Sequence, residues 1–372
     1  MKKEIIIEEL ERLKGINNFR KLKICNGEIL NLSSNDYLGL ANDKELREEF
    51  YKNYRPKLSS SSSRLIDGSY EEIMELEKRA EQIYGKPCIM FNSGFDANSS
   101  LIETFCNKNT LILTDRLNHA SIYDGIINSG AEFLRYKHLD MDSLENLLKK
   151  YREKYEDILV ISETIYSMDG DIADVERLVE LKKKYNFSLM IDEAHSYGVY
   201  GYGIAHNLNL VEDIDFLVIP LGKGGGSVGA MVICENYIKE YIVNKSRKFI
   251  FSTALPPVNS LWNLFILNKM GEFDEKRGKL EFIKNYTLKL LKENGIETDS
   301  TTHIISIIIG NNSRIEKIAE NMRIKGYLLY PVKEPTVPKG TARFRIGLNP
   351  NISIEELETF VKELKYEIDT VF

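Results

Sequence analysis

Short, uninterrupted runs of apolar residues, each ending in a polar or small residue, recur between residues 88 and 234. Runs of this kind are typical of strands that are buried on both faces of a mainly parallel sheet. Helical patterns separate them, as in residues 173–185, where an apolar stripe lies beside a face rich in Lys and Glu. This alternation predicts an α/β fold. The six apolar runs are residues 88–92, 110–115, 158–163, 188–193, 216–221 and 230–234.

The pattern changes after the Pro256–Pro257 pair, where we expect a domain boundary. Long helical segments at residues 278–295 and 313–326 are followed by strand-like runs and a closing helix, which is typical of a small α+β domain. At the other end, the chain is helix-like to about Leu13 and then irregular. The expected domains are an N-terminal arm at 1–40, a large α/β domain at 41–256 and a smaller domain at 257–372.

Composition narrows the class of protein. The 372 residues are 43% hydrophobic and 28% charged, which suits a globular chain long enough for two domains. The net charge of −6 argues against nucleic acid as a partner, and no apolar run approaches the ~18 residues of a membrane span. We expect a soluble, cytoplasmic protein without a metal site or disulfide framework, because the cysteines show no paired spacing. They are Cys25, Cys88, Cys106 and Cys234.

Three chemically useful side chains follow two neighbouring apolar runs. Asp192 and His195 stand in LMIDEAHSYG, and Lys223 stands in VIPLGKGGGSVG. The carboxyl ends of strands are where open α/β sheets bind ligands, so a carboxylate, an imidazole and an amine would meet there. Singly, such an Asp is usually a turn residue and such a Lys is usually solvated surface. The glycines around Lys223 favour a Schiff-base lysine, because they let a planar ligand approach its amine.

Two further segments follow strand ends. NSGFDAN (92–98) opens a helical pattern, so the backbone N–H groups of Gly94 and Phe95 could hold a phosphate, although a plain helix start is equally compatible. His119 in TDRLNHASIYDG could stack on a flat cofactor. The glycine-rich GKGGGSVG also suggests a nucleotide loop, but it lacks the G-x-x-x-x-G-K-[ST] order.

The order of these motifs along the chain resembles that of the α-oxoamine synthases. These are pyridoxal-phosphate enzymes with the aspartate aminotransferase fold, or fold type I, which has a large mainly parallel-sheet domain and a smaller C-terminal domain. The similarity spans about residues 31–350. The matching motifs are NLSSNDYLGL, SRLIDG, FNSGFDAN, TDRLNHAS, SETIYSMDGD, IDEAHSYGV, LGKGGGSVGA, FSTALPP and EPTVPKGTARFR.

The resemblance implies roles for the strand-end residues. Lys223 would hold pyridoxal 5'-phosphate through its ε-amine and later remove the α-proton of the substrate. Asp192 would face the pyridine nitrogen and keep it protonated. His119 would stack on the ring, while His195 and Ser167 would hydrogen-bond near the phenolic oxygen.

The resemblance also implies a homodimer with shared active sites. Gly94 and Phe95 would contact the phosphate through their backbone, and Ser252 and Thr253 would reach it from the neighbouring subunit. Arg345 would bind the carboxylate of the amino acid substrate, with Asn35 assisting.

The EPTVPKGTARFR and LGKGGGSVGA motifs look most like those of the branch of the family that condenses L-alanine with a pimeloyl thioester, giving 8-amino-7-oxononanoate in biotin biosynthesis. The alternatives are a sister synthase that uses glycine or another acyl chain, and a weakly active scaffold that retains the fold. Three features depart from the family pattern and keep those alternatives open. They are Pro220 in place of a phosphate-binding Thr, Ile73 in place of a His, and the serine run Ser59–Ser63 in place of a glycine-rich turn.

Overall fold

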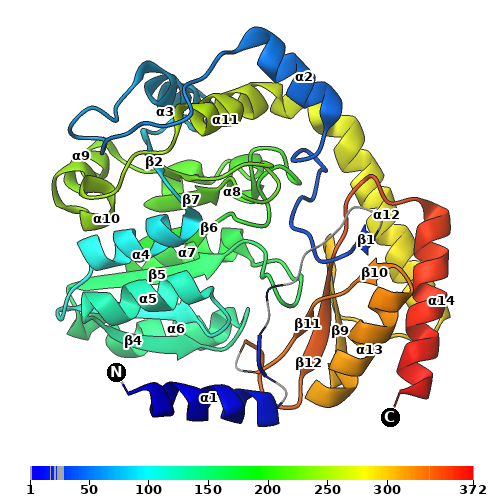
Figure 1. Ribbon diagram of the computed structural model, residues 1–372. Helices are drawn as coiled ribbons and strands as arrows, with labels where there is room; N and C mark the ends of the chain where they lie inside the picture. Colours follow the sequence, from blue (N-terminus) through cyan, green and yellow to red (C-terminus); the bar gives the residue numbers. More distant parts are fainter. Residues whose placement is uncertain (1, 17, 21, 23–28, 335, 372) are drawn as a thin grey trace. The chain divides into compact units, whose positions relative to one another are not determined.

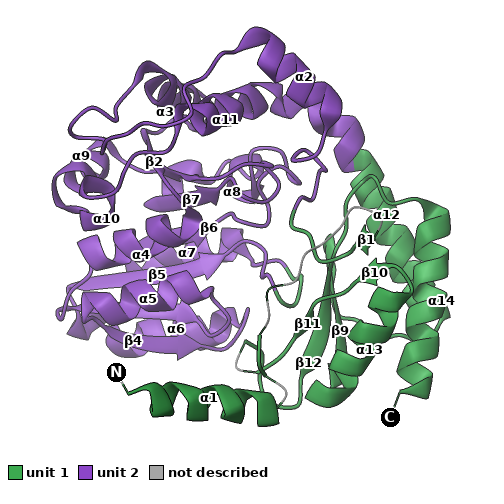
Figure 2. Ribbon diagram, in the orientation of Figure 1, with its two compact units in different colours: residues 1–35, 168–171, 278–372 green, residues 36–167, 172–277 purple. Residues whose placement is uncertain are grey.

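The computed structural model describes residues 2–16, 18–20, 22, 29–334 and 336–371 (Figure 1). The chain forms two compact units, coloured separately in Figure 2. The larger unit comprises residues 36–167 and 172–277, and the smaller unit comprises residues 1–35, 168–171 and 278–372.

The boundary expected at residues 256 and 257 falls inside the larger unit, which continues to Arg277. Pro257 occupies the first turn of helix α11 (Pro257–Lys269) instead of separating two domains. The side chains of this helix pack within the larger unit: Phe265 lies 5.7 Å from Phe50 between ring centroids, and Trp262 Nε1 donates to Gly226 O. Of the arm expected at residues 1–40, residues 36–40 belong to the larger unit and the rest belongs to the smaller one.

The larger unit is built on a seven-stranded sheet in the order β2-β8-β7-β6-β5-β3-β4. Strands β4, β3, β5, β6 and β7 are parallel, and β8 runs antiparallel to both of its neighbours. The strands are β2 (Cys88–Phe91), β3 (Thr110–Asp115), β4 (Glu132–Tyr136), β5 (Asp157–Glu163), β6 (Ser188–Asp192), β7 (Phe216–Pro220) and β8 (Ala230–Ile233).

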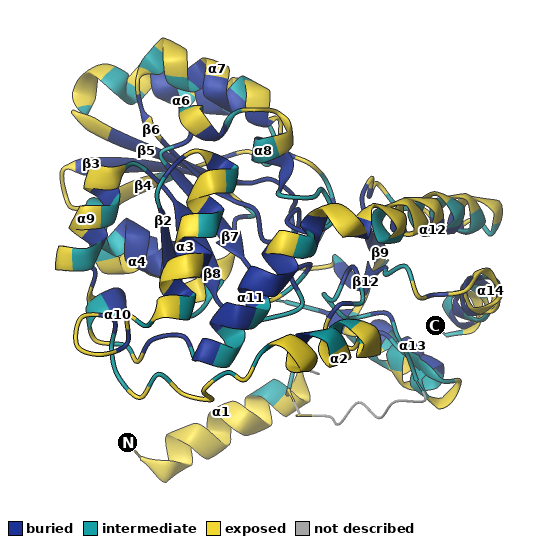
Figure 3. Cartoon of the chain, turned by 90° about the horizontal axis from the view of Figure 1, so that it is seen from above, coloured by how far each residue is buried: buried dark blue, intermediate teal, exposed yellow. Residues whose placement is uncertain are grey.

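Helices cover this sheet, and the strands between them are buried (Figure 3). One core joins apolar residues of the strands, such as Ile112 and Val218, to Leu101 of α4 (Gly94–Phe105), Ile122 of α5 (Ala120–Ser129) and Ile242 of α9 (Asn236–Lys245). The unit also contains the helices α2 (Lys44–Asn53), α3 (Glu71–Tyr84), α6 (Met141–Tyr151), α7 (Val175–Tyr185), α8 (Ile204–Asn207) and α10 (Arg247–Ile250). Its 3-10 turns are η1 (Arg152–Lys154), η2 (Val211–Asp213) and η3 (Met270–Phe273).

The smaller unit contains an antiparallel sheet in the order β11-β12-β9 and a parallel pair, β1 with β10. Helix α14 begins with a capping box, in which Ser353 and Glu356 satisfy each other's backbone N–H groups. The elements of the smaller unit are α1 (Lys3–Gly15), β1 (Leu30–Asn31), β9 (Ile304–Gly310), α13 (Asn312–Ile324), β10 (Tyr327–Leu328), β11 (Pro331–Val332), β12 (Ala342–Gly347) and α14 (Ile354–Thr370). Helix α12 (Asp274–Glu293) crosses the division between the units.

The predicted α/β alternation is confirmed, and each of the six apolar runs contains a strand. No helix of the described chain combines the length and apolar character that a membrane crossing requires. The described residues also hold no group of three or more His, Cys, Asp or Glu arranged to bind a metal ion. Cys88, Cys106 and Cys234 are free and buried, and Cys25 lies outside the described residues.

Candidate active site

Lys223 and His195 are in direct contact in the larger unit. Lys223 Nζ lies 2.8 Å from His195 Nε2, and a second hydrogen bond of 2.6 Å joins His195 Nδ1 to the hydroxyl of Tyr37. His195 follows β6 and Lys223 follows β7, which are adjacent parallel strands. The carboxyl ends of these strands therefore bring the two residues together, as their positions in the sequence predict.

Asp192 ends β6 and is 3% exposed. Its Oδ1 accepts from the backbone N–H of Ala194 at 2.8 Å, and its Oδ2 accepts from Asn98 Nδ2 at 2.6 Å. Asn98 lies in α4 and also donates to Ser121 Oγ of α5 at 3.0 Å. These donors orient the carboxylate and hold it in a buried position.

His119 caps the N-terminus of α5. Its Nδ1 lies 2.8 Å from Ser121 Oγ, and its backbone N–H donates to Glu163 Oε1 at 2.6 Å. Burial lowers the pKa of His119, Lys223 lowers it further, and Asp192 acts in the opposite direction. The imidazole is therefore neutral at pH 7, and the amine and the carboxylate are both close enough to affect it.

Glu163 is a buried carboxyl group of this cluster that the sequence analysis does not single out. It ends β5, directly opposite Asp192 in the register of β5 and β6. Burial and then the charge of Asp192 raise its pKa to about 8, although Lys223 and the N–H of His119 favour the charged form. Glu163 is thus a neutral acid at pH 7. Its position at a strand end, inside the SETIYSMDGD motif, is the signal that could have found it.

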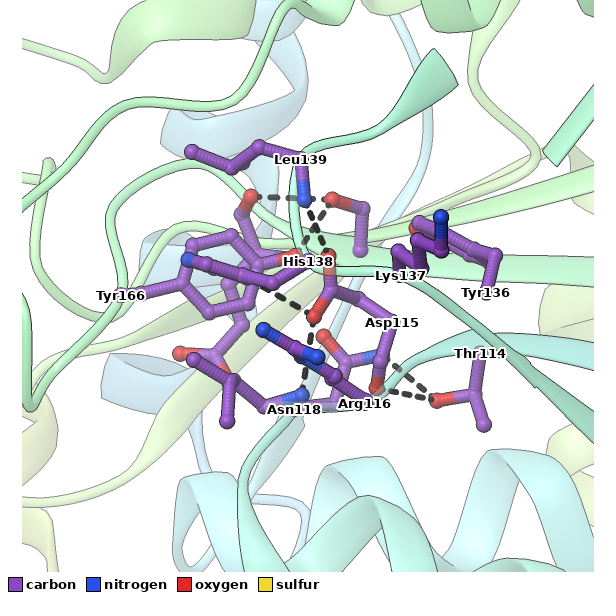
Figure 4. Close-up of polar contacts among 12 residues, drawn as sticks. Thr114, Asp115, Arg116, Asn118, Tyr136, Lys137, His138, Leu139 and Tyr166 are labelled. Atoms are coloured by element: carbon purple, nitrogen blue, oxygen red, sulfur yellow. Dashed lines mark hydrogen bonds and ion pairs between the residues drawn. The ribbon is translucent and has the colours of Figure 1, made fainter. Parts of the chain in front are cut away.

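The loop that leads to His119 is fixed by a second buried carboxylate, Asp115, which Figure 4 shows at the end of β3. Asp115 Oδ1 accepts from the N–H of Leu117 at 2.8 Å and lies 2.9 Å from His138 Nδ1. Its Oδ2 accepts from the N–H of Leu139 at 3.0 Å. Asp115 therefore ties the loop after β4 to the loop that carries His119.

Gly94 and Phe95 form the first turn of α4, whose N-cap is Ser93. A Cβ atom at Gly94 would lie 2.7 Å from Cγ and 2.9 Å from Cβ of Pro220, so the proline ring packs directly against this turn. Pro220 has no hydroxyl to offer a phosphate, but it requires glycine at the helix start. The first backbone N–H groups of a helix have no partner within it, which makes this turn suitable for an anion.

Ser252 and Thr253 lie in a segment that the serine run holds in place. Ser63 forms an antiparallel bridge with Thr253, and Ser60 Oγ donates to Ala254 O at 2.7 Å. The serine run is therefore an ordered segment with defined hydrogen bonds. Asn92, just before α4, donates through Nδ2 to Thr253 O at 2.7 Å, so both segments border the N-terminal turn of α4.

The remaining departure, Ile73, and the predicted cofactor residue Ser167 both belong to the larger unit. Ile73 lies in α3 and is 1% exposed, so it is part of the apolar core. Ser167 lies in the loop after β5, immediately before residues 168–171, which belong to the smaller unit.

The two expected substrate-binding residues, Asn35 and Arg345, lie together in the smaller unit. Leu32 O accepts from the N–H of Gly347 at 2.8 Å, which places the segment before Asn35 along the end of β12. A Cβ atom at Gly347 would lie 2.3 Å from Ser34 O and 3.3 Å from Nη1 of the buried Arg345. The close approach of this segment to β12 therefore requires glycine at position 347.

Comparisons with known proteins decide the family. The family model described as aminotransferase class I and II matches residues 27–364. The chain belongs to this family. Its membership confirms the expected fold class and the expected cofactor, pyridoxal 5'-phosphate.

Among curated proteins, the chain is 42% identical over 337 residues to a protein of Glaesserella parasuis serovar 5 named "Putative 8-amino-7-oxononanoate synthase", covering 88% of this chain and 89% of that one. A protein of the same name from Haemophilus influenzae (strain 86-028NP) is 39% identical over 372 residues, with 95% and 98% covered. These relatives confirm the resemblance to the α-oxoamine synthases.

Among solved structures, a serine palmitoyltransferase from S. paucimobilis matches with a TM-score of 0.89 at 24% identity, covering 99% of this chain and 98% of that one. An 8-amino-7-oxononanoate synthase from Francisella tularensis matches with a TM-score of 0.77 at 25% identity, covering 92% and 99%. The fold is thus shared over almost the whole chain.

The side chains present fit the cofactor. Its aldehyde requires an amine, which Lys223 provides, and its pyridine nitrogen requires a carboxylate, which Asp192 provides in a buried, oriented form. A flat ring requires a neutral stacking partner, and His119 is neutral and near both groups.

Proposed function

We propose that this protein condenses L-alanine with a pimeloyl thioester and releases carbon dioxide and the thiol, so that 8-amino-7-oxononanoate is formed for biotin biosynthesis. The observation that supports a reaction at the α-carbon is the cluster of the Lys223 amine, the Asp192 carboxylate and the neutral His119 in one unit. The choice of alanine and pimeloyl thioester is supported by the similarity to the named relatives.

The bound cofactor supplies a sink for the electrons left on the α-carbon when its proton is removed. Lys223 would hold the cofactor through its ε-amine, and the same amine would serve as the base for that proton. The negative charge of Asp192 would keep the ring nitrogen protonated, and Ala194 and Asn98 orient its two oxygens. His119 covers the ring, and His195 and Ser167 bind near its phenolic oxygen.

The remaining contacts in this proposal concern the substrate and the partner subunit. Arg345 and Asn35 bind the carboxylate of the amino acid. Gly94 and Phe95 hold the phosphate at the start of α4, and Ser252 and Thr253 complete its binding from the second subunit of a homodimer. We expect the reaction in the cytoplasm.

The test combines cofactor retention with product analysis. Purified protein is loaded with pyridoxal phosphate, reduced with borohydride and digested, and the cofactor is expected on the peptide that contains Lys223. Each of alanine, glycine and serine is then mixed with pimeloyl, acetyl and palmitoyl thioesters, and products are identified by mass. We expect alanine with pimeloyl thioester to react fastest, and Lys223→Ala to lower the rate by roughly 10³-fold or more.

Two results would contradict the proposal. A product only from glycine or serine would assign the protein to a different synthase of the same family. Absence of covalent cofactor in the wild-type protein, with no product from any pair, would favour a scaffold that retains only the fold.

A further inference from the structure

Tyr37 is a buried residue to which the sequence analysis assigns no role. It stands in NLSSNDYLGL, two positions after Asn35, and its side chain is 0% exposed within the larger unit. Its hydroxyl lies 2.6 Å from His195 Nδ1, with ring centroids 5.9 Å apart. A hydrogen bond this short between buried side chains fixes the orientation of the imidazole.

His195 lies between Tyr37 and Lys223, with one ring nitrogen directed at each. The residue is 3% exposed. A neutral imidazole has one nitrogen that donates and one that accepts. The role of Nε2 toward the amine of Lys223 therefore determines the role that Nδ1 must take toward the phenol of Tyr37.

The two protonation states of Lys223 allow different arrangements. An ammonium group donates to Nε2, so that Nδ1 carries the proton and donates to the oxygen of Tyr37. A neutral amine gains a lone pair and can accept from Nε2–H, and Nδ1 then accepts from the hydroxyl of Tyr37. A hydroxyl can do both, because it has one donor hydrogen and two acceptor lone pairs.

We propose that Tyr37 is a positioning residue whose hydroxyl lets His195 remain hydrogen-bonded to Lys223 in both protonation states of the amine. Its importance for the reaction rests on the proposed function, in which Lys223 must exist as an amine to bond the cofactor and to accept the α-proton. The hydrogen-bond coupling itself does not depend on that function. A phenyl ring at position 37 would fill the same space and leave the buried Nδ1 without this partner.

The test compares Tyr37→Phe with the wild-type protein by nitrogen NMR of ¹⁵N-histidine-labelled, cofactor-free protein. The chain has five histidines, and the His195→Gln variant assigns the His195 signals. In the wild-type protein, the two ring nitrogens of His195 are expected to exchange donor and acceptor character as the pH is raised. In Tyr37→Phe, that exchange is expected to be lost.

A second readout is the rate at which cofactor-free protein takes up pyridoxal phosphate on Lys223, followed by absorbance. We expect Tyr37→Phe to slow uptake about three- to tenfold, the effect of one hydrogen bond. Tyr84→Phe is the matched control, because it removes a buried hydroxyl that donates to Tyr202 O at 2.7 Å, and its uptake rate is expected to stay at the wild-type value.

Unchanged His195 signals and an unchanged uptake rate in folded Tyr37→Phe would overturn the proposal. If that variant does not fold, 3-fluorotyrosine at position 37 keeps the ring and hydroxyl but makes the hydroxyl a stronger donor. It should then shift His195 toward the Nε2–H form, and the absence of a shift would overturn the proposal. If wild-type Lys223 takes up no cofactor, the proposed function fails, and the NMR comparison still decides the role of Tyr37.

Discussion

Glu163 links folding to pH at the scale of a single residue. Its pKa of about 8 lies above the ordinary 4.5 because of burial and the nearby charge of Asp192. A carboxyl group with a raised pKa in the folded state contributes full stability below pH 4.5, and this contribution is lost as the pH rises toward 8. The unfolded chain releases the same proton more easily, so the folded state becomes relatively less stable.

Glu163→Gln should therefore be more stable than the wild-type protein at pH 8, by more than about 1 kcal/mol, with little difference at pH 4.5. The amide oxygen can still accept the N–H of His119. Urea unfolding of cofactor-free protein at several pH values measures the difference. Glu193, whose pKa is raised to about 7, is present in both proteins, so its contribution to the pH dependence of stability cancels in the comparison. Exposed Glu176→Gln serves as the control, and a Glu163→Gln difference as flat with pH as that of the control would contradict the prediction.

Strand-end positions located Asp192, His195 and Lys223 from the sequence, because the carboxyl ends of parallel strands share one edge of a sheet. Glu163 also stands at the end of a strand. The sequence does not show, however, which of two carboxyl groups at the ends of neighbouring strands, Glu163 or Asp192, will be protonated. Tyr37 could not be found in this way, since it reaches His195 from a distant segment, and such contacts depend on tertiary structure.

At the scale of elements, α4 and α5 approach each other closely where the site is assembled. A Cβ atom at Gly125 of α5 would lie 2.9 Å from Ser99 Cα and 2.9 Å from Ile102 Cβ of α4. Asn98 and His119, which belong to the cluster of the site, are positioned by these two helices. The separation of α4 and α5 is therefore set by a residue without a side chain.

Gly125→Ala should lower the free energy of unfolding by about 1–3 kcal/mol, because neighbouring backbone atoms must move. The variant should also release pyridoxal phosphate faster, since Asn98 moves with α4. Gly278→Ala in α12 is the contrasting control: a Cβ atom there meets nothing within 4 Å, so helix propensity should stabilise it by about 0.5–1 kcal/mol. Thermal unfolding and cofactor release measure both effects, and equal behaviour of the two variants would contradict this interpretation.

The sequence pattern predicted most strands but missed β4, for a physical reason. Residues 132–136 form the edge of the sheet, and all of them except Tyr136 are exposed or half-buried. An edge strand therefore lacks the continuous apolar run that identifies its buried neighbours. Pro256 and Pro257 stand at the start of α11, because a Pro-Pro pair can begin a helix as readily as it ends a domain.

At the scale of the whole molecule, the proposed homodimer makes each active site depend on two chains. A Lys223→Ala chain mixed with a Ser252→Ala/Thr253→Ala chain should regain activity that neither has alone. In the mixed dimer, one site combines an intact Lys223 with intact Ser252 and Thr253 from the other subunit.

Activity of unfolded and refolded mixtures, compared with each variant refolded alone, measures this recovery. Roughly half of the sites in each mixed dimer should be functional. If Ser252 and Thr253 served their own chain instead, no mixed dimer would contain a complete site, and the mixture would stay inactive.

The smaller unit has a consequence for biosynthesis, because it is assembled from both ends of the chain. Leu30 and Asn31 of β1 pair with Tyr327 and Leu328 of β10, so a strand translated before the larger unit waits for a strand translated after it. The larger unit is fully translated at residue 277 and can fold while that strand is still without its partner. A ribosome that stalls between these points would present a folded larger unit with β1 still unpaired, which is the form that chaperones and proteases would meet.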